Sequence, residues 1–227
     1  MSIAAGGLRF TILIPRVGRF PPRSEIIDPM LVLASASPRR RELLAQAGFS
    51  FEVAAAQINE DPRPEESPIA YVTRLAREKA EAIAGSPKYA ADESVMVLGA
   101  DTTVVAPTGE ILAKPLNNAD AARMLRLLSG ATHKVITGVA LVAGDHTEVA
   151  AEVTYVTMRT LSDEEIAAYL QTGEAHDKAG SYAIQGYAAR WIPRVHGCYF
   201  NVVGLPLALV TAMIEGVEAK IAQTATR

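Results

Sequence analysis

The fold of this chain is decided by the stretch Leu31-Val32-Leu33-Ala34-Ser35-Ala36-Ser37-Pro38-Arg39-Arg40-Arg41-Glu42-Leu43-Leu44-Ala45-Gln46-Ala47-Gly48. Its first four residues form an apolar run that is typical of a buried strand. Ser37 suits the N-cap of a helix, Pro38 suits its first position, and Gly48 suits its end. The stretch therefore predicts a strand, a tight turn and a helix, which is the repeating unit of α/β folds.

Strands and helices continue to alternate along the chain on both sides of the polar segment 57–67. The expected elements are, in order, strand 49–55, helix 68–84, strands 95–98, 103–106 and 110–113, a helix capped by Asn118, strands 133–143 and 148–158, a helix opened by the capping box at Ser162, a strand near 188–195, and a helix from Pro206. No linker rich in proline and glycine divides residues 30–227. We therefore expect one α/β domain there, with a mixed twisted sheet, flanking helices and two lobes around a central cleft.

Composition narrows the class of protein. About half of the 227 residues are apolar (49%), which is enough for a substantial core, and the net charge of −3 gives no reason to expect nucleic-acid binding. A single cysteine, Cys198, excludes a disulfide within the chain and suggests a reducing, cytoplasmic compartment. No apolar run is long enough to span a membrane, so we expect no membrane partner.

The first 29 residues differ from the rest. They contain four arginines and no acidic residue before Glu25. We expect them to form a disordered extension, with a transit peptide as the alternative. Met30 stands directly before the first clear strand, so translation starting there is a further alternative.

The turn between the first strand and helix is the first candidate binding site. A helix N-terminus offers unpaired N–H groups and a partial positive charge that attract phosphate. Ser35 and Ser37 add hydroxyl groups, and Arg39 and Arg40 add guanidinium groups that can hold phosphate oxygens in pairs. Three arginines in a first helical turn are unfavourable unless an anion binds there. The alternative is a solvated basic helix start with Ser37 as a plain cap.

Two carboxylates are the second candidate site. Asp101 ends an apolar strand, where ligand sites of open α/β sheets gather. It could hold Mg²⁺ or Mn²⁺, or act as the general base on a water molecule, and the alternative is a turn hydrogen bond with Thr102 or Thr103. Glu60, in a polar loop, would complete a metal site, although an exposed loop acid is the simpler interpretation.

Three further polar residues are candidates for contacts with a nucleotide. Lys114 stands before a proline at a strand end and could neutralise a phosphate. Lys79 could do the same, but its acidic helix neighbours make a surface ion pair the default interpretation. Gln185 carries both a donor and an acceptor, which complement N3–H and O4 of a pyrimidine, and the alternative is an ordinary loop amide.

Together these segments resemble the Maf family of nucleotide pyrophosphatases, whose members are also called septum-formation inhibitors. The resemblance runs from about Met30 to Glu215. It rests on six motifs in order: Leu33-Ala34-Ser35-Ala36-Ser37-Pro38-Arg39-Arg40, Gly99-Ala100-Asp101-Thr102, Lys114-Pro115, Leu128-Ser129-Gly130 with His133 to Gly138, Asp177-Lys178-Ala179-Gly180 with Ile184-Gln185-Gly186, and Asn201-Val202-Val203-Gly204-Leu205-Pro206.

The resemblance implies hydrolysis of a nucleoside triphosphate to the monophosphate and pyrophosphate, with a divalent metal cation, as a house-cleaning activity. The segment Tyr182-Ala183-Ile184-Gln185-Gly186 is similar to the branch that acts on dTTP and UTP, and modified pyrimidine nucleotides are further candidates. Ala113 and Asn59 depart from the residues common in the family. The carried-over roles are Asp101 as proton acceptor, Ser35, Arg39, Arg40, Glu60, Lys79 and Lys114 at phosphate and metal positions, and Arg39, Thr102 and Gln185 in base choice.

Two other functions stay open at this point. The family's second name suggests a nucleotide-binding inhibitor of septum formation and cell division that acts through a partner. A nucleotidyl- or glycosyltransferase could use the same phosphate-binding turn. The oligomeric state cannot be predicted from the residues, although members of the family tend to form homodimers.

Overall fold

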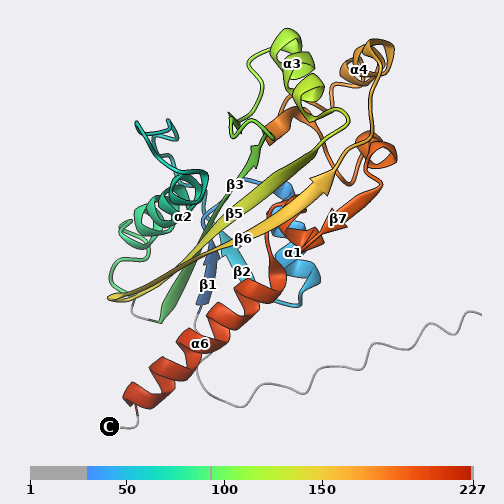
Figure 1. Cartoon of the computed structure of the whole chain (residues 1–227). Helices are drawn as coiled ribbons and strands as arrows, with labels where there is room; N and C mark the ends of the chain where they lie inside the picture. Colours follow the sequence, from blue (N-terminus) through green and yellow to red (C-terminus); the bar gives the residue numbers. More distant parts are fainter. Residues whose placement is uncertain (1–29, 93, 226–227) are drawn as a thin grey trace, which may run out of the picture.

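A twisted sheet of seven strands organises the protein in the computed structural model, which describes residues 30–92 and 94–225 (Figure 1). The expectations of a disordered extension, a transit peptide and a start at Met30 concern residues 1–29, which lie outside this range. The strand order is β2-β1-β3-β5-β6-β7, with β4 paired to β3. The strands are β1 (Met30–Leu33), β2 (Phe51–Val53), β3 (Val95–Val105), β4 (Ile111–Leu112), β5 (Thr132–Ala143), β6 (His146–Thr157) and β7 (Arg194–His196).

The sheet is mixed, as the sequence predicts. β1 pairs in parallel with β2 and β3, whereas the pairs β3–β5, β5–β6 and β6–β7 are antiparallel. Strand β1 and helix α1 (Pro38–Gln46) are the strand and helix predicted from the opening stretch. The predicted helix at 68–84 is also confirmed, as α2 (Pro68–Ala84).

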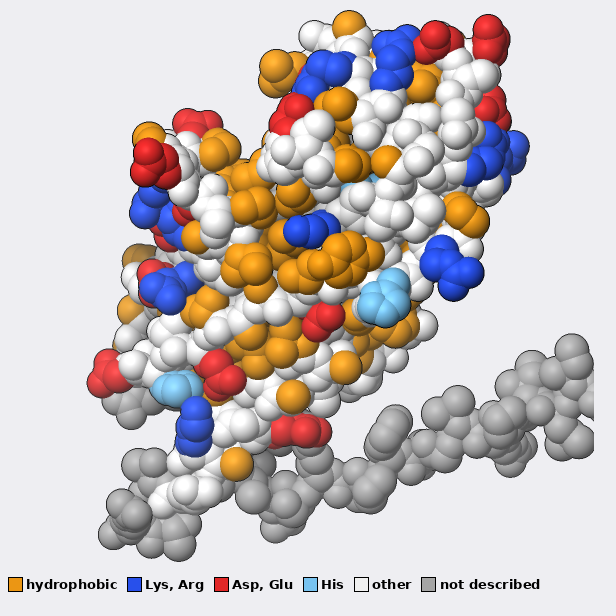
Figure 2. All heavy atoms as spheres, viewed as in Figure 1, with side chains coloured by type: hydrophobic (Ala, Val, Ile, Leu, Met, Phe, Trp, Pro, Cys, Tyr) orange, Lys and Arg blue, Asp and Glu red, His pale blue; other side chains and the backbone are white. Residues whose placement is uncertain are grey.

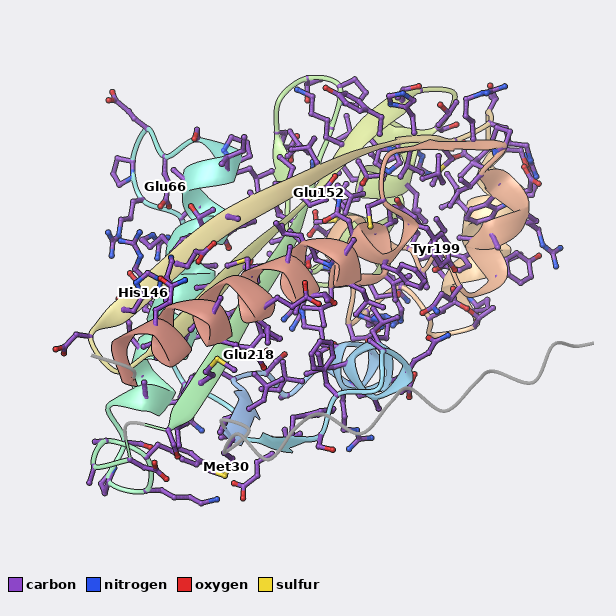
Figure 3. The ribbon with its side chains drawn as sticks, turned by 90° about the horizontal axis from the view of Figure 1, so that it is seen from below. Met30, Glu66, His146, Glu152, Tyr199 and Glu218 are labelled. Carbon is purple, nitrogen blue, oxygen red and sulfur yellow. The ribbon has the colours of Figure 1, made fainter. Side chains whose placement is uncertain are left out.

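Helices cover both faces of the sheet. Successive residues of a strand point to opposite faces, so Leu31 and Leu33 pack with α1 and α6 (Leu207–Ala225), and Val32 packs with α2. Figure 1 shows α2 and α6 on opposite sides of the strands, and Figure 3 shows α6 running lengthwise along the sheet. The outer strand β6 is only half-buried over most of its length, and apolar side chains gather in the middle of that face (Figure 2).

Strand β3 is longer than expected. The predicted break at Gly99-Ala100-Asp101 is wrong, because these residues continue the strand from Val95 to Val105. A Cβ atom on Gly99 would lie 2.1 Å from the carbonyl oxygen of Ala76 on α2. The glycine therefore permits close packing between the helix and the strand, and it does not end the strand.

A second group of elements packs at the far end of β3, β5 and β6. It comprises α3 (Asn118–Leu128), α4 (Asp163–Leu170) and two 3₁₀ helices, η1 (Ala179–Ser181) and η2 (Tyr187–Trp191). The capping box at Ser162 is confirmed, but the cap of α3 is Asn117, whose side chain accepts from Asp120 N, and not Asn118. The strand predicted near 188–195 is mostly η2, and only β7 is extended. The short helix α5 (Tyr199–Val203) was not predicted.

No helix in the described part of the chain is long and apolar enough to cross a membrane.

His133 is a buried titratable residue at the start of β5, where the sheet meets Tyr182, just after η1. Its Nε2 lies 2.8 Å from the Tyr182 hydroxyl, and its Nδ1 has no hydrogen-bond partner among the described residues. Burial lowers the pKa of the imidazole from 6.5 to about 4. The neutral ring is therefore the form that the folded protein accommodates.

We expect the free energy of unfolding to fall as the pH drops from about 6.5 to 4, because the unfolded chain then binds a proton that folded His133 excludes. The loss attributable to His133 is about 3 kcal/mol at pH 4 and is absent above about pH 7. Urea unfolding of the wild type and His133→Gln across this range measures it as a difference, which removes the contribution of carboxyl groups. Parallel curves for the two proteins would contradict the assignment.

Candidate active site

One cavity of about 570 Å³ lies where the sheet, with α1 and α2, meets the second group of elements. It receives side chains from the start of α1, from α2, from the middle of β3, from the loop after β4 and from the segment around η1. All ten residues predicted from the sequence line this cavity: Ser35, Ser37, Arg39, Arg40, Glu60, Lys79, Asp101, Thr102, Lys114 and Gln185. Phosphate-binding and carboxylate residues that are far apart in the sequence therefore share one site.

The start of α1 has the features expected of an anion site. Ser37 is the N-cap, and its hydroxyl accepts from the backbone N–H of Arg40, while Pro38 occupies the first turn. The first turn contains no acidic residue. The positive end of the helix dipole and Arg39 therefore combine without an internal counter-charge, which favours an anionic ligand.

Arg40 connects the three segments that form the floor of the cavity. Its Nε donates to the carbonyl oxygen of Gly204 at 2.8 Å, Nη1 donates to Ser35 Oγ at 3.2 Å, and Nη2 donates to Thr102 Oγ1 at 3.0 Å. Burial lowers the pKa of this guanidinium, but arginine stays charged because its ordinary value is so high. Arg40 thus joins the start of α1, the middle of β3 and Gly204 at the end of the short helix α5.

Lys79 lies between the two carboxylates that the sequence singles out. Its ammonium nitrogen is 2.7 Å from Glu60 Oε1 and 2.7 Å from Asp101 Oδ1. Partial burial acts to raise the pKa of the Glu60 carboxyl, but the hydrogen bond from Lys79 and the charges of Lys79, Lys114 and Arg40 outweigh burial and lower it. Lys79 is buried, so the surface ion pair considered for it is wrong.

The described residues offer a partial metal site. Among residues 30–92 and 94–225, no three histidine, cysteine or acidic side chains cluster closely enough to hold a metal ion by themselves. Glu60 and Asp101 supply two carboxylates, which share contacts with Lys79. This donor set fits a hard cation such as Mg²⁺, which commonly takes one or two carboxylates and completes its shell with substrate phosphates and water.

The loop that carries Glu60 is fastened to α2. The Tyr71 hydroxyl donates to the carbonyl oxygen of Glu60 at 2.9 Å, and Arg74 donates to that of Asp61 at 3.1 Å. Arg74 also pairs with Glu66, which lies beside the start of α2 (Figure 3). Asn59, a departure from the family pattern, accepts from the backbone N–H of Asp61 and so helps to shape the loop.

The residues linked to base choice all line the cavity, but their environments differ. The Thr102 hydroxyl is already bonded to Arg40 and to Thr137, at 2.9 Å from the latter. Gln185 is exposed, and its amide makes no hydrogen bond with any described residue. Gln185 is therefore the freer of the two to bind a ligand.

Three site residues were not assigned a role from the sequence. Asp177 Oδ2 lies 3.5 Å from Arg39 Nη1, Tyr71 holds the Glu60 loop, and Gly204 accepts from Arg40. Gly204 has a φ of 128°, a conformation that favours glycine. Asp177 and Gly204 belong to the sequence motifs, but their long-range contacts left no local signal.

Comparison with known proteins covers this whole site. A family model described as Maf-like protein matches residues 30–217. The dTTP/UTP pyrophosphatase of Koribacter versatilis is 52% identical over 184 residues, which are 81% of this chain and 92% of that protein. Proteins with the same name from Geobacter sulfurreducens and Vibrio cholerae are 53% and 50% identical over 182 and 177 residues, which are 79% and 78% of this chain and 92% of each relative.

We expect Arg40→Ala to destabilise the fold by about 3 kcal/mol, because three hydrogen bonds from its guanidinium group to distant segments are lost. Urea unfolding followed by the fluorescence of Trp191 measures this change. Arg41→Ala is the matched control, since Arg41 is exposed on the same helix. Equal, small effects of the two substitutions would show that Arg40 does not hold these segments together.

Proposed function

We propose that this chain, which belongs to the Maf family, is a nucleoside triphosphate pyrophosphatase that hydrolyses dTTP and UTP to the monophosphate and pyrophosphate. The observation that carries this function is that one cavity brings together a helix N-terminus and a set of arginine, lysine and carboxylate side chains. Its curated relatives with this activity are about half identical to it.

The basic residues bind and align the triphosphate. The N–H groups at the start of α1, the Ser35 and Ser37 hydroxyls and Arg39 hold phosphate oxygens, while Lys114 reaches the cavity from the loop after β4. Arg40 retains two of its five N–H groups for a phosphate oxygen, counting its contacts with the described residues. Pyrophosphate leaves with its developing negative charge neutralised by these groups.

The metal is a proposal that the donor chemistry supports. Glu60 and Asp101 would hold Mg²⁺ or Mn²⁺ together with phosphate oxygens, and such a cation polarises the phosphoryl group and neutralises charge when bound. Lys79 pairs with both carboxylates and so holds them close to each other.

Asp101 acts on the attacking water. Its carboxylate, which Lys79 holds from one side, accepts a hydrogen bond from a water molecule. Asp101 thereby orients this water toward the α-phosphorus and takes a proton from it. The water oxygen bonds to the α-phosphorus, and the bond between this phosphorus and the α–β bridging oxygen breaks, so that the bridging oxygen leaves with pyrophosphate. Proximity and orientation supply much of the rate, since the anhydride needs little covalent help.

Base choice falls to Gln185 with Arg39 and Thr102. The free amide of Gln185 can accept from N3–H and donate to O4, a pattern that thymine and uracil share.

A nucleotide substrate and a single cysteine support a cytoplasmic location.

A panel of canonical and modified triphosphates, with products identified by chromatography, tests the function. We expect pyrophosphate and monophosphate in equal amounts, fastest from dTTP and UTP. Release of orthophosphate, a need for a second acceptor, or binding without turnover would each contradict it, and the last two outcomes would indicate a transferase and a regulator respectively.

We expect Asp101→Asn to lower kcat for pyrophosphate release by at least about 100-fold, because the amide cannot take the proton from water. The melting temperature should stay close to that of the wild type. Asp145→Asn is the control, since Asp145 is exposed in the turn between β5 and β6. Unchanged turnover in the Asp101 variant would remove it from the reaction.

Removal of divalent cations with EDTA should abolish pyrophosphate release, and added Mg²⁺ or Mn²⁺ should restore it. Glu60→Gln should raise the concentration of Mn²⁺ needed for half-maximal activity by about tenfold, because one charged donor is lost. Paramagnetic resonance of Mn²⁺ with dTTP present measures the binding directly. Full activity in EDTA would contradict the metal requirement.

A further inference from the structure

We propose that Glu174 is a positioning residue for base recognition, because its carboxylate holds the loop that presents Gln185 to the cavity. The inference rests on the proposed role of Gln185 in base choice. Glu174 lies on the segment after α4, eleven residues before Gln185, and it is not among the residues that line the cavity.

Both carboxylate oxygens of Glu174 are engaged. Oε1 accepts a hydrogen bond from the Tyr169 hydroxyl at 3.0 Å, and Oε2 accepts from the backbone N–H of Tyr187 at 3.0 Å. One bond reaches α4 and the other reaches the residue that follows Gln185-Gly186. The carboxylate therefore joins the loop that carries Gln185 to helix α4.

Gly186 lies so close to this carboxylate that no side chain would fit between them. A Cβ atom on Gly186 would lie 2.2 Å from Oε1 and 2.4 Å from Oε2 of Glu174, well inside contact distance. The φ of Gly186 is −107°, so the backbone itself would tolerate another residue. The missing side chain is thus required by the position of Glu174 and not by the turn.

Tyr169, the other hydrogen-bond donor to the Glu174 carboxylate, is held rigidly. Tyr169 is completely buried and packs edge-on against Trp191, with ring centroids 5.0 Å apart. Burial raises the pKa of the Tyr169 hydroxyl, and the Glu174 charge raises it further, so the hydroxyl stays protonated and donates. Tyr187 packs against the same two rings, which fixes the end of the loop.

Gln185 depends on this support. Ile184 on one side packs against the apolar core, and on the other side Gly186 N donates to the Ala183 carbonyl at 3.1 Å. The Gln185 amide has no hydrogen bond with the described residues. Its position over the cavity is therefore set by the backbone that Glu174 holds.

The test is the ratio of kcat/KM for dTTP to that for dCTP, which is also a pyrimidine nucleotide but lacks the 5-methyl group and presents a different hydrogen-bonding edge. The variants are Glu174→Ala, Glu174→Gln, Gly186→Ala, the double variant with alanine at 174 and 186, and Gln185→Ala. Glu215→Ala, at an exposed position on α6, is the control. Thermal melting of each variant shows whether it folds.

We expect Glu174→Ala to lower the dTTP-to-dCTP ratio by about tenfold, close to the effect of Gln185→Ala, with kcat for dTTP within about twofold of wild type. Glu174→Gln should keep the ratio, because its amide can accept from Tyr187 N and donate to Tyr169. Gly186→Ala should lower the ratio strongly in the wild-type background and little in the Glu174→Ala background, since the added methyl group then has room.

An unchanged ratio in a folded Glu174→Ala variant would overturn the inference, and so would additive effects at 174 and 186. A Gln185→Ala variant with wild-type preference would overturn it as well, because the loop would then present no base-reading group. These results differ from failure of the proposed function, which would appear as no pyrophosphate release by the wild-type protein.

Discussion

The three hydrogen bonds of Arg40 are the interaction on which the rest of the site depends. They connect the start of α1 to residues 62 and 164 positions away, so that β3 and the end of α5 are held around one helix N-terminus. A cation in a first helical turn opposes the helix dipole. Arg40 tolerates this position because three of its five N–H groups donate to fixed oxygen atoms. Arg39 makes no such bonds to the backbone of the described residues and pairs only loosely with Asp177, at 3.5 Å, so it can turn to a ligand.

Charge balance in the cavity follows from the same arrangement. Lys79 bridges Glu60 and Asp101, so two carboxylates lie close together without a metal. Among the described residues, five basic and four acidic side chains line the cavity, so a small excess of positive charge remains, which favours an anionic ligand. The polyphosphate, together with a cation, would complete the set. Hydrolysis needs little more than this neutralisation and one oriented water.

Local signals in the sequence predicted much of this. Ser37 and Pro38 define the start of α1 through their own backbone preferences, and the ten candidate residues share one cavity. The predictions from the sequence fail where contacts with other segments or small differences between neighbouring residues decide the local structure. Gly99 reads locally as the end of a strand, but it permits close approach by α2. Asn117 caps α3, and the adjacent Asn118 offers the same side chain, so the sequence does not separate the two. The partnership of Glu174 with Gly186 depends on a contact that no local pattern encodes.

The central claim is that a triphosphate binds between the start of α1 and Asp101. A crystal structure with dTTP carrying an imido group in place of the α–β bridging oxygen, with Mg²⁺, tests it most directly. The account predicts phosphate oxygens on the N–H groups after Ser35 and on Arg39, the cation beside Glu60 and Asp101, and the thymine edge at Gln185. A nucleotide bound elsewhere, or with its base at α1 and its phosphates in solvent, would contradict it.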